Sequence, residues 1–261
     1  MLLAIDIGNS NISIGIFQKS TLTHSWRITS DLLKEADEYS VLLSSLVTEV
    51  PILKNSSNFH IVMCSVVPPL TDTLSQACSK LFKLEPLIIG RQIHPNITIN
   101  YDVPEDVGAD RIVNALAARS IYGGQSLIIV DLGTATVFDA ISKEGSYLGG
   151  AIAPGLALSG EALFLKASQL KQVELAFPPR AIGQNTNSSV QSGLIFGHIS
   201  LIEGMVNKFK QELGKTSKVI GTGGMINHII ACTTVFDIVE PNLSMEGLRL
   251  AFEYYNNPTK N

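Results

Sequence analysis

The chain has 261 residues, of which 45% are hydrophobic and only 16% are charged, so it is long and apolar enough for one large domain or two ordinary ones. Its net charge of −4 and pI of about 5.7, without any run of lysines or arginines, argue against nucleic acid or an anionic membrane as the main partner. The mean hydropathy of +0.25 is typical of buried parallel or mixed sheets covered by helices.

The cysteines and the first residues indicate in which cellular compartment we expect the protein. Cys64, Cys78 and Cys232 are odd in number and scattered, so they predict neither a disulfide framework nor a Cys-x-x-Cys metal pair, and we expect a reducing cytoplasm. We expect no signal peptide, because only five apolar residues precede Asp6 and no basic leader accompanies them. We also expect no membrane span, because no uncharged apolar run approaches the about 18 residues that one requires.

The predicted elements of the first half follow a β-β-β-α-β-α-β order, which is typical of an α/β layer with helices on both faces. In chain order we expect an antiparallel meander of strands at 2–7, 12–17 and 22–28, a helix at 33–50, a strand at 61–64, a helix at 69–82 and a strand at 87–89. A helix at 104–121 follows and ends at the glycine pair Gly123-Gly124. Trp26 is expected in the core.

The second half repeats the opening of the first. In chain order we expect strands at 127–131, 135–141 and 146–153, a helix at 188–213, a strand at 218–220, a short helix and a final helix at 244–255. Residues 256–261 are expected to form a frayed tail. Because the halves share an order of elements, duplication is the economical explanation.

One short motif ends the first strand of each half. Apolar residues lead into Asp6-Ile7-Gly8-Asn9 in the first copy and into Asp131-Leu132-Gly133-Thr134 in the second, and another strand follows each copy. A carboxylate at the end of an apolar strand is costly unless it meets a cation, a donor or water. A glycine turn that returns as a hairpin suits a metal-bound phosphate. We interpret both carboxylates as cation ligands beside ATP, the alternative being aspartates that only cap their own turns.

Two further features suit a nucleotide. The turns at Gly8 to Asn11 and at Gly133-Thr134 offer backbone N–H groups that bind phosphate oxygens as nests do, although these are also ordinary turn residues. Gly221-Thr222-Gly223-Gly224 follows a predicted strand, where backbone can approach a flat ligand closely. That signal is weak alone and gains weight as a third element of one nucleotide site.

The helix between the halves carries Gly108-Ala109-Asp110-Arg111 near its start. Neighbouring residues on a helix face different directions, so Asp110 and Arg111 can contact different parts of one substrate. Asp110 could orient a hydroxyl and accept its proton, and Arg111 could bind a carboxylate bidentately. The alternative is a surface ion pair or a helix-capping set.

With these residues the chain resembles the type III pantothenate kinases, a family of the acetate and sugar kinase, Hsp70 and actin superfamily, over nearly its whole length. The motifs that carry the resemblance are, in chain order, Ile5 to Asn11, Cys64 to Pro69, Gly108 to Asn114, Asp131 to Thr136, Tyr147 to Gly155, Gly183 to Thr186 and Thr222 to Gly224. Ser10 stands where threonine is usual in the family. Because serine keeps the hydroxyl, we expect little loss of activity.

The resemblance implies two duplicated ribonuclease H-like (actin-like ATPase) domains, residues 1–115 and 116–261. Each would be an α/β domain with a mixed five-stranded sheet flanked by helices, and the active site would lie in the cleft between them. It implies ATP-dependent phosphorylation of pantothenate to 4′-phosphopantothenate, the first step of coenzyme A biosynthesis. It also implies a cytoplasmic homodimer with pantothenate sites near the subunit interface.

The resemblance also implies roles for individual residues. Asp110 would be the proton acceptor, Asp131 would hold a monovalent cation (potassium or ammonium), and Asp6 would lie at the magnesium that accompanies ATP. ATP would be contacted by Asp6, Ile7, Gly8, Asn9, Ser10, Asn11, Ile12, Ser13 and Thr134. Pantothenate would be contacted by Tyr101, Gly108, Ala109, Asp110, Arg111 and Thr186.

Two other functions are compatible with parts of the pattern. The first is another kinase of the superfamily, acting on a sugar or acetate, against which Arg111 argues because it suits a carboxylate substrate. The second is a non-catalytic regulator, because the family includes relatives described as accessory factors for virulence-gene transcription. Loss of Asp6, Asp110 or Arg111 would favour these readings, and all three residues are present.

Overall fold

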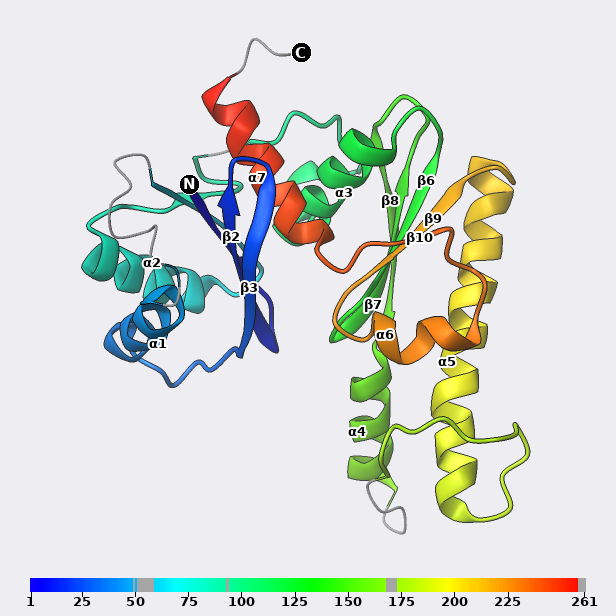
Figure 1. Ribbon diagram of the computed structural model, residues 1–261. Helices are drawn as coiled ribbons and strands as arrows, with labels where there is room; N and C mark the ends of the chain where they lie inside the picture. The colour runs from blue at the N-terminus through cyan, green and yellow to red at the C-terminus, as the bar shows by residue number, and fades with distance from the viewer. Residues whose placement is uncertain (49, 51–58, 93, 168–172, 258–261) are drawn as a thin grey trace. The chain divides into compact units, whose positions relative to one another are not determined.

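The computed structural model describes residues 1–48, 50, 59–92, 94–167 and 173–257, which form an α/β protein with two five-stranded sheets (Figure 1). The chain divides into two compact units, which we describe separately. The first comprises Met1–Ile97, Val103–Ala117 and Leu243–Asn261, and the second comprises Thr98–Asp102 and Ala118–Asn242. The predicted pair of mixed five-stranded sheets flanked by helices is therefore confirmed. The predicted domain boundary between residues 115 and 116 stays a prediction.

The first sheet has the strand order β3-β2-β1-β4-β5. Its strands are β1 (Leu2–Ile7), β2 (Asn11–Gln18), β3 (Thr21–Thr29), β4 (His60–Ser65) and β5 (Leu87–Ile88). The first three strands pair antiparallel, as the predicted meander requires, whereas β4 pairs parallel with both β1 and β5. The central strand β1 is buried along almost its whole length, which explains its continuous apolar run.

Helices cover both faces of the first sheet, because alternate residues of β1 point to opposite sides. Leu3 and Ile5 share a core with α1 (Ala36–Thr48) and α2 (Pro68–Phe82). Leu2 and Ala4 share another core with residues of α3 (Ala109–Tyr122) and α7 (Leu243–Asn256). Since Asp6 follows Leu2 and Ala4 at the same period, it lies on the face that α3 and α7 cover.

The second sheet repeats this plan, with the order β10-β9-β6-β7-β8. Its strands are β6 (Leu127–Leu132), β7 (Ala135–Ile141), β8 (Tyr147–Pro154), β9 (Lys218–Thr222) and β10 (Ile238–Val239). As in the first sheet, the opening strand pairs antiparallel with the next strand and parallel with a strand far along the chain. The predicted repetition of order is confirmed. The helices of this unit are α4 (Leu156–Lys166), α5 (Thr186–Leu213) and α6 (Ile226–Ile229).

Several boundaries differ from the predictions. The helix expected at 104–121 is divided into a 3₁₀ turn, η2 (Pro104–Asp106), and α3, because Val107 adopts an extended conformation. The helix expected at 33–50 begins only at Ala36; residue 49 lies outside the described residues. The sequence predicted neither α4 nor β10, nor the short 3₁₀ helix η3 (Ile230–Cys232).

The structure also bears on two smaller expectations, the burial of Trp26 and the tail at residues 256–261. Trp26 is only partly buried and stacks on His24, with a centroid separation of 5.7 Å. Helix α7 extends to Asn256, and of the expected tail the residues 258–261 lie outside the described part of the chain. Within the described residues, none of the helices combines the length and the apolar character that crossing a bilayer needs.

Candidate active site

Asp6 lies at the end of β1 between two polar partners on neighbouring strands. Its register partner on the antiparallel strand β2 is Ser13, and its partner on the parallel strand β4 is Cys64. The Cys64 thiol is fully buried and donates to Asp6 Oδ1 at 3.2 Å. The Asp6 side chain is half-buried, and desolvation raises the pKa of its carboxyl above the ordinary value of 3.8.

The turn after Asp6 is a tight hairpin. Gly8 N–H donates to Asn11 O at 3.0 Å, and the side chains from Asn9 to Asn11 are exposed. Ser30, from the end of β3, holds this turn, because its hydroxyl donates to Gly8 O at 2.6 Å and its N–H donates to Ser10 O at 3.0 Å. Sequence reasoning missed Ser30, since nothing local marks a serine that acts across a sheet.

The remaining members of the predicted phosphate loop contribute differently. Ile7 and Ile12 are fully buried in the core of the first unit, so their side chains support the loop from below and only their backbone can serve it. Ser13 is half-buried on β2. The predicted loop therefore consists of exposed polar tips on an apolar base.

Asp110 lies in the first turn of α3 and belongs to the same unit as Asp6. Its Oδ1 accepts the Arg111 N–H at 2.8 Å. A Cβ built on Gly108 would come 2.5 Å from that oxygen, so the glycine gives the carboxylate its room. Burial raises the pKa of Asp110, while the Arg111 N–H and charge act in the opposite direction.

The carboxylates of Asp6 and Asp110, both in the first unit, interact electrostatically. The negative charge of Asp110 contributes, after desolvation, to the raised pKa of Asp6. The structure thus brings together two residues that are far apart in the sequence. Arg111 is buried, with only 9% of its surface exposed. A buried guanidinium next to a half-buried carboxylate suits an anionic substrate that also carries a hydroxyl.

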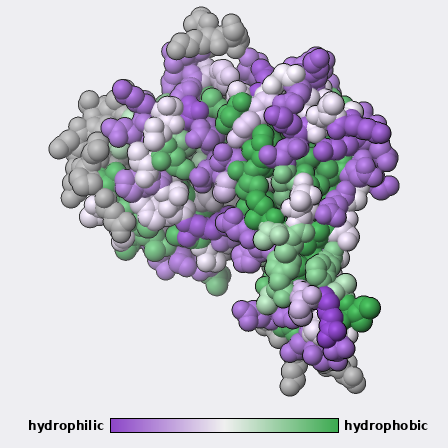
Figure 2. All heavy atoms as spheres, turned by 45° about the vertical axis from the view of Figure 1, so that its right-hand side comes forward, coloured by the Kyte–Doolittle hydropathy of each residue, from purple (hydrophilic) through white to green (hydrophobic). Residues whose placement is uncertain are grey.

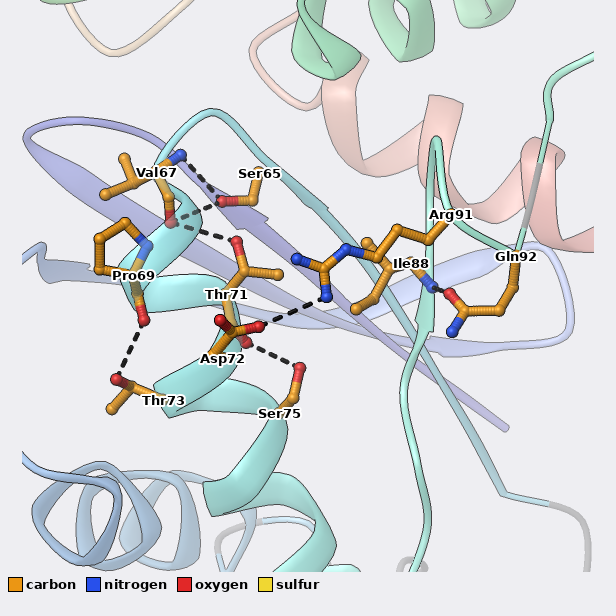
Figure 3. Close-up of polar contacts among 10 residues, drawn as sticks. All are labelled: Ser65, Val67, Pro69, Thr71, Asp72, Thr73, Ser75, Ile88, Arg91 and Gln92. Carbon is orange, nitrogen blue, oxygen red and sulfur yellow. Dashed lines mark hydrogen bonds and ion pairs between the residues drawn. The ribbon is translucent and has the colours of Figure 1, made fainter.

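The connection that follows Cys64 is fixed by its own hydrogen bonds (Figure 3). Ser65 Oγ accepts the Val67 N–H at 3.0 Å, and Thr71 Oγ1 donates to Val67 O at 3.1 Å. Prolines occupy the first positions of α2, where a missing N–H leaves no helical bond unmade. This arrangement ends β4 sharply and explains the Cys64 to Pro69 motif.

An ion pair ties the same helix to the segment after β5. Arg91 Nη1 lies 3.4 Å from Asp72 Oδ1, and Gln92 Oε1 accepts the Ile88 N–H at 2.9 Å (Figure 3). Because Arg91 and Asp72 are both largely exposed, their pair contributes little to stability. These residues are not among the predicted site residues.

In the second unit Asp131 ends β6 as Asp6 ends β1. Its register partner on the parallel strand β9 is Thr222, and Gly223 follows with φ of +92°. A Cβ on Gly223 would overlap Asp131 Oδ1 and would come within 2.6 Å of Leu132 N and O. The predicted glycine-rich segment therefore packs directly against the second predicted carboxylate.

Thr134 lies at the tip of the second hairpin, between β6 and β7. Its side chain is exposed, Gly133 N–H donates to Ala135 O at 3.0 Å, and Gly155 N–H donates to Thr134 O at 3.1 Å. The backbone after β8 therefore returns to brace this turn. As in the first unit, a polar tip stands on a buried base.

Two predicted pantothenate contacts lie in the second unit. Tyr101 is 39% exposed, and its ring lies 3.4 Å from the position of a Cβ on Gly149. Thr186 begins α5 directly after the capping residue Asn185 and lines a groove of about 790 Å³ with Ser159 and Gly183. Among the described residues, the lining of that groove does not include Tyr101.

The described residues contain no cluster of three or more His, Cys, Asp or Glu side chains that would enclose a metal ion. A magnesium ion that accompanies a nucleotide does not need such a cluster, because it uses one or two carboxylates together with water and phosphate oxygens. The single half-buried carboxylate of Asp6, beside exposed loop amides, fits that pattern.

Comparison with known proteins gives consistent results. The family model described as type III pantothenate kinase matches residues 2–208. A type III pantothenate kinase from Dehalococcoides mccartyi (strain CBDB1) is 46% identical over 252 residues, which cover 97% of this chain and 95% of the relative.

Solved structures extend the comparison to the fold. A protein from Campylobacter jejuni, described as a transcriptional activator of the Baf family, has a TM-score of 0.58 at 20% identity and covers 98% of this chain and 99% of its own. MreB5 of Spiroplasma citri bound to ADP has a TM-score of 0.54 at 12% identity, with coverages of 100% and 98%. At these identities the similarity shows the fold alone, which is the predicted actin-like ATPase fold.

Proposed function

Because the chain belongs to the type III pantothenate kinases, we propose that it transfers the γ-phosphoryl group of ATP to the primary hydroxyl of pantothenate. The product is 4′-phosphopantothenate, formed in the first step of coenzyme A biosynthesis. The observation that carries this proposal is the 46% identity to a pantothenate kinase across 97% of the chain. The presence of Asp6, Asp110 and Arg111 supports it.

Asp110 is proposed as the proton acceptor. Phosphoryl transfer has a loose transition state, so positioning and neutralisation of oxygen charge matter more than a strong base. Burial raises the pKa of Asp110, which makes its carboxylate a better acceptor than an exposed one. It remains far too weak to ionise an alcohol beforehand. Asp110 would therefore orient the hydroxyl and take its proton late.

Arg111 is proposed to bind the carboxylate of pantothenate. Its buried guanidinium can donate two parallel hydrogen bonds to a carboxylate, which explains how an acidic protein recognises an anionic substrate. Gly108, Ala109, Tyr101 and Thr186 are proposed as the remaining contacts. Their support is the family motif, together with the exposed positions of Tyr101 and Thr186.

The loop from Asp6 to Ser13 is proposed to line the ATP phosphates, and Thr134 is proposed as a further ATP contact. The exposed small polar side chains at the tips of the two hairpin turns support this assignment. Asp6 would hold the magnesium that neutralises charge on the phosphate oxygens. Asp131 is proposed to hold a monovalent cation, potassium or ammonium, because its carboxylate ends a buried strand beside the Gly223 backbone.

A homodimer is proposed, with the second-unit helices as its contact surface. Large apolar side chains are exposed along this part of the chain, including Leu165 at 82% on α4 and Ile182 at 81% before α5. Figure 2 shows apolar residues reaching the surface over these elements. Leu165→Glu should turn a dimer into a monomer in sedimentation at micromolar concentration. The matched Leu33→Glu, at a side chain 90% exposed in the first unit, should leave the dimer intact. A wild-type chain that sediments only as a monomer would contradict the proposal.

The reaction is tested by a coupled ADP-release assay with pantothenate against a panel of sugars and acetate, with potassium and with sodium. We expect ADP release only with pantothenate, and much faster release with potassium. Release with a sugar or acetate would favour another kinase of the superfamily, and rates indifferent to the cation would remove Asp131 from its assigned role.

The three cysteines are free thiols, which supports the expected cytoplasmic location.

A further inference from the structure

The buried thiol of Cys64 occupies an unusual place for a core cysteine. It lies on the face of the first sheet that α3 and α7 cover, and it is the parallel register partner of Asp6. Side chains of register partners on parallel strands point to the same face, so the thiol and the carboxylate are set side by side by the sheet itself. Their separation of 3.2 Å between Sγ and Oδ1 is that of a hydrogen bond.

The thiol is the donor in this contact. The hydrogen bond runs from Cys64 Sγ to Asp6 Oδ1, and the thiol is fully buried. A protonated S–H beside a carboxylate can only donate to it. By contrast Cys78, the other fully buried cysteine, belongs to α2 and packs in the apolar core, where burial raises its pKa to about 12.

A carboxylate needs such a partner to hold its orientation. The χ2 torsion of aspartate is broad and nearly two-fold, so a carboxylate at the end of a strand rotates unless hydrogen bonds fix it. Asp6 has the thiol on one side and the hydroxyl of Ser244, in the first turn of α7, as another side-chain partner. These two partners come from segments that are remote from Asp6 in sequence.

We propose that Cys64 is a positioning residue for Asp6, whose thiol fixes the carboxylate in the rotation that meets the magnesium ion of a bound nucleotide. The inference rests on the proposed role of Asp6 in magnesium–nucleotide binding and adds the residue that sets its geometry. Because Ser244 remains as a second partner, removal of the thiol weakens the site without abolishing it.

The test uses matched alanine and serine variants of the two buried cysteines in the full-length protein. Calorimetry measures ADP affinity with and without Mg²⁺, steady-state kinetics measure KM for ATP and for pantothenate, and urea unfolding measures stability. A hydrogen bond to a charged group contributes enough that its loss changes affinity about tenfold. Cys64→Ala should therefore weaken Mg²⁺-dependent ADP binding and raise KM for ATP by about tenfold, leaving KM for pantothenate within about twofold.

The other variants separate positioning from packing. Cys64→Ser keeps a donor and should stay within about threefold of wild type in Mg²⁺-dependent ADP affinity. Cys78→Ala should lower the urea midpoint and leave both KM values unchanged, because its cavity lies in an apolar core. A Cys64→Ala variant that binds Mg²⁺ and ADP like wild type would overturn the inference, as would a Cys64→Ser variant as weak as Cys64→Ala.

Asp6→Asn distinguishes this inference from the proposed function on which it rests. In the Asp6→Asn background, Cys64→Ala should have no further effect on Mg²⁺-dependent ADP affinity, because a positioning residue acts through its partner. An equal loss in both backgrounds would make Cys64 merely structural. If Asp6→Asn alone binds Mg²⁺ and ADP like wild type, Asp6 does not hold the ion, and the proposed role of Asp6 falls together with that of Cys64.

Discussion

Replacement of Gly223 by alanine should damage the second unit severely, although the change adds only one methyl group. The residue follows β9 with φ of +92°, a conformation that L side chains rarely adopt. The added Cβ would also overlap Asp131 Oδ1 and come within 2.6 Å of the Leu132 N and O atoms. The carboxylate can rotate away, but the Leu132 backbone belongs to β6 and cannot move without disturbing the sheet.

The size of the loss follows from these two effects. Left-handed backbone costs an L residue about 1–2 kcal/mol, and overpacking costs about 1–3 kcal/mol. The sum of about 2–5 kcal/mol is a large part of the about 5–15 kcal/mol that typically stabilises a native protein. A Gly223→Ala protein that does fold should also need more potassium for half-maximal activity, because Asp131 has been displaced.

Urea unfolding measures the total loss, and hydrogen exchange read by mass spectrometry assigns it to one unit. We expect faster exchange in β6 and β9 and little change in β1 and β4. The matched control is Gly204→Ala, at an exposed position of α5 with open space around the new Cβ, which should gain about 0.5–1 kcal/mol. A Gly223→Ala protein within about 0.5 kcal/mol of wild type would refute the steric reasoning.

Three further predictions concern the first unit. Asp110→Asn should lower kcat by about 10²–10⁴-fold and yet raise stability at neutral pH. The raised pKa of Asp110 makes the unfolding free energy of the wild type fall as pH rises from the ordinary 3.8 through the folded-state pKa, so the advantage of the variant in urea unfolding should vanish in acid. Ser30→Ala removes the 2.6 Å bond to Gly8 O and should raise KM for ATP several-fold, with kcat nearly unchanged; an unchanged KM would mean that the loop holds itself. Gly247→Ala would overlap Val113 O and should destabilise the packing of α7 on α3 by about 1–3 kcal/mol, which the urea midpoint checks.

Local signals allowed much of each sheet to be predicted. The runs that became β1 and β6 are continuous apolar segments closed by Asp-x-Gly, so both period and turn chemistry agreed with the final structure. Helix α4 escaped prediction because its apolar side chains do not keep to one face: Leu156 is buried whereas Leu165 is 82% exposed. The strand β10 has only two residues, which are too few to show a periodic hydrophobic pattern in the sequence.

The contacts that build the site could not be read from the sequence, since they join distant segments. Cys64 meets Asp6 across 58 positions, through parallel pairing whose register only the folded sheet defines. Gly223 meets Asp131 by the same kind of pairing between β9 and β6. The sequence motifs identified these residues separately, whereas the three-dimensional arrangement shows which of them act on one another.

The two units place equivalent carboxylates in different surroundings, and this difference supports different cations for them. Asp6 has a thiol donor at its register partner on the parallel strand, and the orientation that we propose this donor fixes would suit the strict octahedral geometry of magnesium. At Asp131 the parallel partner is Thr222 in place of a cysteine, and the backbone of Gly223 packs closely against the carboxylate. A larger monovalent cation tolerates looser geometry and accepts backbone oxygens. Duplication therefore explains why two Asp-x-Gly hairpins exist, and the identity of the neighbouring parallel strand explains why they need not bind the same ion.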